Sequence, residues 1–145
     1  MKKVLLLLFV SSLNLLSMQE VKWETNLESA LIRAKAENKI VFVDVWAAWC
    51  GPCIRLKKEV FPTPIAQAAL AQVIPLDLQT RTEDNSATQN VWAETAYSIE
   101  AYPSMLFLDQ NGKRIGNMQL GFITPEKLSS WISEMRASYS KKPSK

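Results

Sequence analysis

The apolar run at residues 40–46 constrains this 145-residue chain most strongly, because it leads directly to both of its cysteines. The run is apolar on both faces except at Asp44, which is typical of a central strand covered on both sides. Cys50-Gly51-Pro52-Cys53 follows shortly afterwards. Pro52 suits the first turn of a helix, where the N–H that proline lacks would have no partner. The sequence therefore places a cysteine pair where a buried strand gives way to a helix.

Two cysteines at this spacing form either a redox-active pair or half of a metal site. The chain has no histidine and no third cysteine, so we predict no metal site. An inert disulfide and two free buried thiols are the structural alternatives. A bridge this short closes almost no loop and stabilises the fold little, so a redox function is the preferred interpretation.

The position of each cysteine predicts its role in disulfide exchange. The thiolate is the reactive species, and a helix N-terminus stabilises negative charge. We expect Cys50 to be an exposed nucleophile and Cys53, one turn later, to be sheltered beneath it. Cys50 would attack a substrate disulfide, and Cys53 would then resolve the mixed disulfide. Gly51 leaves room for a substrate backbone, and Pro52 stiffens the turn.

Asp44 is the second informative residue, because a carboxylate within an apolar strand is costly unless it is protonated or hydrogen-bonded. Burial should raise its pKa and allow it to take the proton from Cys53. A buried aspartate that bonds only to backbone or water is the alternative. We expect Trp46 to lie mostly in the core and Trp49 to be partly exposed beside Cys50.

The remaining pattern predicts an α/β fold. Helices are expected at residues 26–37, from Pro52 to Pro62, and at 63–71, 87–96 and 124 onward, with strands at 40–46, 73–78, 105–108 and 113–120. Strands separated by helices imply parallel pairing, and the last two strands form an antiparallel hairpin. We therefore expect a mixed central sheet with helices on both faces.

The two ends of the chain differ from its body. A positive start and a short apolar segment make residues 1–19 a predicted signal peptide, cut after Ser17 or Gln19; a buried N-terminal element of a cytosolic protein is the alternative. Residues 20–138 form the predicted domain and 139–145 a polar basic tail. Without the five lysines of the ends, 12 basic residues face 14 acidic ones. No basic stripe remains, so we expect no nucleic-acid partner.

The motif Trp49-Cys50-Gly51-Pro52-Cys53 resembles the signature of the thioredoxin family. Asp44 lies where the family keeps a buried acid, Tyr102-Pro103-Ser104 resembles its cis-proline segment, and Gly121 matches one of its glycines. The resemblance extends over residues 23–132. Residues 23–39 and the long loop at 80–90 are most similar to secreted relatives and to the C-terminal periplasmic domain of the transmembrane thiol:disulfide interchange protein.

This resemblance implies a thioredoxin fold and a thiol-disulfide oxidoreductase that uses a redox-active Cys50–Cys53 disulfide and no other cofactor. It implies a substrate-binding surface formed by Trp49, Gly51, Pro52, Tyr102 and Pro103. The expected protein is a periplasmic or secreted monomer that reduces protein disulfides, with a membrane thiol reductase as candidate electron donor. An oxidase or isomerase using the same site and a non-catalytic interaction module are the alternatives.

Two residues depart from the family pattern. Pro75 stands where cytosolic thioredoxins carry a lysine beside the buried acid, which leaves Asp44 without that partner. Tyr102 is bulkier than the residue that usually precedes the cis-proline, which affects the expected partner specificity.

Overall fold

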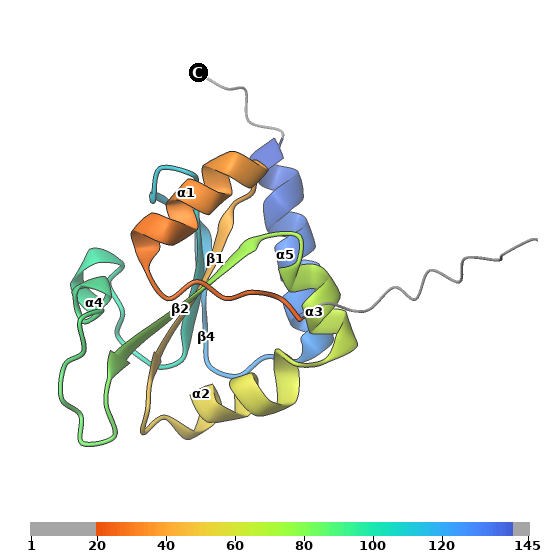
Figure 1. Cartoon of the computed structure of the whole chain (residues 1–145). Helices are drawn as coiled ribbons and strands as arrows, with labels where there is room; N and C mark the ends of the chain where they lie inside the picture. Colours follow the sequence, from red (N-terminus) through yellow and green to blue (C-terminus); the bar gives the residue numbers. More distant parts are fainter. Residues whose placement is uncertain (1–19, 141–145) are drawn as a thin grey trace, which may run out of the picture.

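The computed structural model describes residues 20–140, and Figure 1 shows their arrangement. The predicted signal peptide at 1–19 and residues 141–145 of the predicted tail lie outside this part of the chain. The elements in chain order are α1 (Leu27–Glu37), β1 (Val41–Ala47), α2 (Gly51–Arg55), the π-helical turn η1 (Leu56–Val60), α3 (Pro64–Leu70), β2 (Ile74–Arg81), α4 (Trp92–Ala96), β3 (Ser104–Leu108), β4 (Arg114–Leu120) and α5 (Pro125–Ser140).

The sheet is mixed, with strand order β2-β1-β3-β4. β1 and β2 are parallel, whereas β3 is antiparallel to both β1 and β4. The prediction that the first three strands all run in parallel is therefore wrong for β3. The connection between β2 and β3 begins and ends at the same end of the sheet, since Ser104, the first residue of β3, pairs with Val45 near the end of β1.

Helices cover both faces of the sheet, as the sequence predicts. Phe42 of β1 belongs to the core shared with η1, α3 and α5, whereas Val41 and Val43 belong to the core shared with α1 and α4. Figure 1 shows α1 and α4 on one side of the strands and α3 and α5 on the other. Alternate β1 residues thus enter opposite cores, which is why the run at 40–46 is apolar throughout.

The helical predictions hold best near the cysteines. The run from α2 through η1 ends before Pro62, and α3 begins after Thr63, whose side chain accepts a hydrogen bond from the N–H of Ala66. α5 extends to Ser140, two residues past the predicted domain boundary. None of the helices within residues 20–140 is long and apolar enough to cross a membrane.

The predicted helix at 87–96 is confined to α4 at its C-terminal half. The Thr88 hydroxyl donates to the carbonyl of Gln79 and accepts from the N–H of Asn90. These bonds attach the segment to β2 and replace helical hydrogen bonds, which is how threonine side chains compete with helix formation. The segment between β2 and α4 is therefore an ordered connection along the sheet edge.

Candidate active site

The two cysteines are joined by a disulfide at the start of α2, with their Cα atoms 5.3 Å apart. Cys50 is the N-cap residue, and Pro52 lies in the first turn, where the sequence predicts it. The backbone N–H of Cys53 donates to Cys50 Sγ at 3.2 Å. In the reduced protein this donor would stabilise a thiolate on Cys50, because a hydrogen bond to a charged acceptor is stronger than one to a neutral acceptor.

Access to the disulfide is narrow. Cys53 is fully buried, and Cys50 is only 4% exposed, far less than the sequence-based expectation of an exposed nucleophile. Two aromatic side chains, Trp46 and Tyr102, pack against the cysteine pair. Gly51 and Pro52 are exposed, and a Cβ added at Gly51 would meet nothing within 4 Å. The chain directly after Cys50 is therefore open to solvent.

Asp44 lies in the middle of β1 and is completely buried. Neither carboxylate oxygen has a hydrogen-bond partner within residues 20–140. Burial raises the pKa of Asp44 to about 7, with the Lys57 cation opposing this rise and the nearby Asp77 carboxylate adding to it. A carboxyl with such a pKa can exchange a proton near neutral pH.

Lys57 of η1 is a charged partner that the sequence analysis missed. Its Nζ lies 3.5 Å from Asp44 Oδ2 and also forms an ion pair with Asp77 of β2. The expectation that Pro75 leaves Asp44 without a lysine is therefore corrected, because the helix after the cysteines supplies one in place of the strand. Its spacing could have indicated this role, because Lys57 follows Cys53 by four residues and therefore shares its helix face.

Trp46 fixes the position of this lysine and its second carboxylate. Its indole N–H donates to Asp77 Oδ1 at 2.5 Å, and Lys57 Nζ lies 4.2 Å from the centroid of its ring. In the parallel register of β1 and β2, Asp44 stands opposite Asp77. One cation is thus shared by two carboxylates, one fully buried and the other near the surface.

The Tyr102–Pro103 peptide bond is cis, as the family resemblance implies. The ring of Tyr102 meets that of Trp49 edge to face, with centroids 5.6 Å apart. Pro103 itself is buried, and its carbonyl accepts a hydrogen bond from the N–H of Gly121 at 2.9 Å. Trp49 is half exposed. All five predicted substrate-binding residues therefore lie on the segments around the disulfide.

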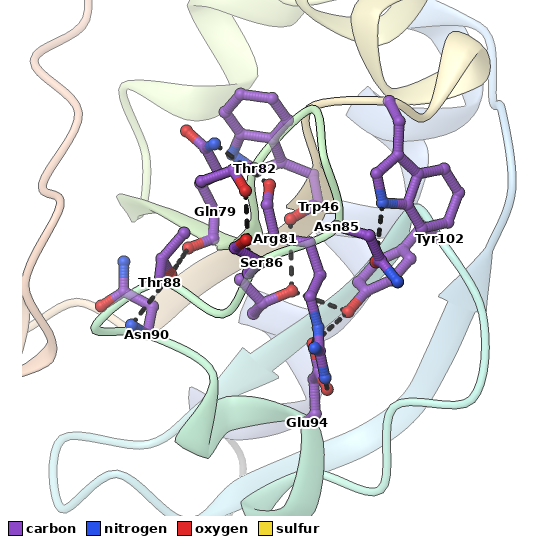
Figure 2. A network of polar contacts seen from close by, with 12 residues as sticks. Trp46, Gln79, Arg81, Thr82, Asn85, Ser86, Thr88, Asn90, Glu94 and Tyr102 are labelled. Atoms are coloured by element: carbon purple, nitrogen blue, oxygen red, sulfur yellow. Dashed lines mark hydrogen bonds and ion pairs between the residues drawn. The ribbon is translucent and has the colours of Figure 1, made fainter.

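A polar network behind Tyr102 was not predicted. Figure 2 shows Arg81, Glu94 and Tyr102 converging, with Arg81 donating two hydrogen bonds to the Glu94 carboxylate. The ion pair with Arg81 lowers the pKa of Glu94 to about 2. The Tyr102 hydroxyl donates to Glu94 and lies 2.7 Å from Thr80 Oγ1. Nothing local to these residues indicated the network, because it depends on how α4 meets the sheet.

Comparison with known proteins agrees with this geometry. The chain is 35% identical over 104 residues to the thiol:disulfide interchange protein DsbD of Pseudoalteromonas atlantica, and 28% identical over 123 residues to that of Haemophilus ducreyi. These alignments cover 71% and 83% of the chain but only 17% and 20% of the relatives. The chain thus spans about a fifth of the length of these proteins.

Solved structures show the same fold. The oxidised C-terminal domain of DsbD from Neisseria meningitidis superposes with a TM-score of 0.63 at 20% identity, covering 79% of this chain and all of that domain. The DsbH oxidoreductase superposes with a TM-score of 0.64 at 15% identity, covering 85% and 87% of the two chains. The thioredoxin-like domain family matches residues 27–136. The chain therefore belongs to the thioredoxin-like domain family and carries its Cys50–Cys53 disulfide at the start of α2.

Proposed function

We propose that the chain is a periplasmic or secreted thiol-disulfide oxidoreductase that mainly reduces disulfides of exported proteins. The observation that carries the proposal is the Cys50–Cys53 disulfide, with a backbone N–H aimed at the Cys50 sulfur. The similarity to the thiol:disulfide interchange proteins supports both the reaction and the location. The disulfide itself is the redox group, and the proposal requires no other cofactor.

In the first step the protein and the substrate become joined by a mixed disulfide. The Cys50 thiolate attacks one substrate sulfur and forms a mixed disulfide, while the other substrate sulfur leaves as a thiolate and takes up a proton. The open space at Gly51 admits the substrate. The exposed surfaces of Trp49 and Pro52 then contact its backbone.

The second step releases the reduced substrate. The Cys53 thiol gives its proton to the Asp44 carboxylate and attacks Cys50 Sγ, which re-forms the protein disulfide and frees the second substrate thiolate. The substrate gains two electrons and the protein loses them. A thiol donor must then reduce the Cys50–Cys53 disulfide, and we propose a membrane thiol reductase for this role.

A trapping experiment tests the mechanism. In Cys53→Ser the mixed disulfide through Cys50 cannot be resolved, so substrates should accumulate as complexes that a reducing agent releases. Cys50→Ser is the matched control and should trap nothing. If neither variant traps a partner and both retain the wild-type function, the chain is a non-catalytic interaction module.

The direction of electron flow is tested separately by equilibrating the cysteine pair with glutathione. Thioredoxins have potentials of about −270 mV, whereas the strongest periplasmic oxidant lies near −120 mV. We expect a reduction potential near that of thioredoxins. A value near the oxidant would contradict the reductant assignment and favour an oxidase or isomerase that uses the same site.

A further inference from the structure

Two aromatic side chains that contact each other lie beside Cys50, and we call them the aromatic walls. Tyr102 packs against the cysteine pair, and its ring meets that of Trp49, the residue before Cys50, edge to face. Cys50 is only 4% exposed, although Gly51 after it is open to solvent. Access to Cys50 therefore depends on how firmly the two rings are held.

Tyr102 is held by residues remote from the cysteine motif. Its hydroxyl contacts both the completely buried Thr80 and the carboxylate of Glu94. The double hydrogen bond from Arg81, at 2.8 and 2.6 Å, fixes Glu94 in turn. The low pKa of Glu94 keeps this anchor ionised across the neutral range. Figure 2 shows the three side chains meeting beside the end of β2.

Trp49 is held by the connection between β2 and α4, the two elements that hold Tyr102. Its indole N–H donates to Asn85 Oδ1 at 3.0 Å. Asn85 has a φ of 66° and lies at the tip of a turn in which its own N–H donates to the carbonyl of Thr82. Asparagine tolerates this left-handed conformation better than most residues. Residues 80–94 thus supply the hydrogen bonds that hold both aromatic walls.

We propose that Thr80, Asn85 and Glu94 are positioning residues that fix the two aromatic walls and so restrict exchange at Cys50 to sulfur atoms carried on narrow polypeptide segments with small flanking residues. The inference rests on the proposed function and names its substrate class. Exchange requires the incoming sulfur to reach Cys50 Sγ itself. Branched side chains beside that sulfur would collide with rings that these hydrogen bonds hold in place.

Two thiol peptides test this restriction on the oxidised full chain. N-acetyl-glycyl-cysteinyl-glycinamide is the narrow probe and N-acetyl-valyl-cysteinyl-valinamide the bulky one. In each reaction a peptide thiolate attacks Cys50 Sγ and Cys53 leaves as a thiolate. A second peptide thiolate then attacks the peptide sulfur of the mixed disulfide, releasing reduced protein and a peptide disulfide. Tryptophan fluorescence follows the rates, which are expressed per thiolate.

We expect the wild type to prefer the narrow peptide, and loss of either wall anchor to reduce this preference. Tyr102→Phe and Glu94→Ala should each lower the rate ratio roughly fivefold, as expected for loss of one hydrogen bond, by speeding the bulky peptide. Asn85→Gly removes the amide without straining the backbone and should act in the same direction. Tyr97→Phe, which removes a tyrosine hydroxyl outside the site, is the control and should keep the wild-type ratio.

The outcomes separate the inference from the proposed function. The variants should first be shown to unfold at the same urea concentration as the wild type. If their ratio of narrow-peptide to bulky-peptide rate is then unchanged, the positioning role is wrong. Glu94→Gln keeps an acceptor for the Tyr102 hydroxyl and should restore most of the ratio lost in Glu94→Ala; failure to do so would contradict the hydroxyl anchor. Absence of exchange with either peptide would refute the proposed function itself.

Discussion

At the scale of single residues, two neighbouring charges shift the pKa of Asp44 in opposite directions. Lys57 Nζ lies 3.5 Å away and stabilises the carboxylate, whereas Asp77 repels it. The fully buried carboxyl has no hydrogen bond within residues 20–140 to balance its loss of solvation. The two neighbours should therefore set the pH at which Asp44 can accept the proton of Cys53.

Substitution of these neighbours should move the pH dependence in opposite directions. Lys57→Met removes the stabilising cation and should shift the midpoint for resolution of the mixed disulfide to higher pH. Asp77→Asn removes the repelling carboxylate and should shift it to lower pH. The measurement is the rate of product release from a preformed mixed disulfide at about pH 5 to 9. This range spans neutrality, where the Asp44 carboxyl exchanges its proton.

Lys58→Met is the matched control, because it removes an exposed lysine from the same turn. Its midpoint should equal that of the wild type. Shifts of the same sign in Lys57→Met and Asp77→Asn would contradict the assignment of Asp44 as the proton acceptor.

At the scale of elements, β4 faces α5 at Gly116. This residue has a φ of 66°, and a Cβ added to it would lie 2.5 Å from Cε of Met135. Because Cε is the flexible end of the Met135 side chain and can move aside, backbone strain should dominate. Gly116→Ala should lower the free energy of unfolding by about 1–2 kcal/mol, measured by urea denaturation.

Gly121→Ala provides the comparison for this prediction. Gly121 has a φ of 76°, but a Cβ there would meet nothing within 4 Å. Backbone strain alone should act there as well, so the loss should be about 1–2 kcal/mol. Equal losses at the two glycines are therefore expected, and a clearly larger loss at Gly116 would show that Met135 cannot move aside.

At the scale of the whole molecule, the buried acid makes stability depend on pH. The folded pKa of Asp44, about 7, lies above its ordinary value of 3.8, so the folded state binds more protons than the unfolded state between these limits. The contribution of the protonated form is fully present below pH 4 and is lost as the pH rises through 7. Each pKa unit corresponds to about 1.4 kcal/mol.

Asp44→Asn should therefore raise the free energy of unfolding at pH 8 by several kcal/mol, on the order of 1.4 kcal/mol for each unit of the raised pKa. The difference from wild type should become small near pH 4. Urea denaturation of the oxidised protein at both values measures this effect. A difference that does not vary with pH would mean that the carboxyl is not protonated in the folded state near neutrality.

The sequence alone determined the features that arise within a few residues. The apolar run at 40–46 specified a strand covered on both sides, Pro52 specified a helix start, and the cysteine pair lay between them. The burial of Asp44 followed from its apolar neighbours. Side-chain alternation and helix-start preferences are local effects, so the sequence predicts them directly.

Only the tertiary structure decided which distant groups meet. Lys57 and Asp77 are 20 residues apart in the chain, and Tyr102 and Thr80 are 22 apart. The first pair depends on how the helix after the cysteines lies across β1 and β2. The second depends on the connection through α4, because β3 starts at the same end of the sheet at which β2 ends. Strand direction and register are set by packing of the whole sheet, which no local pattern encodes.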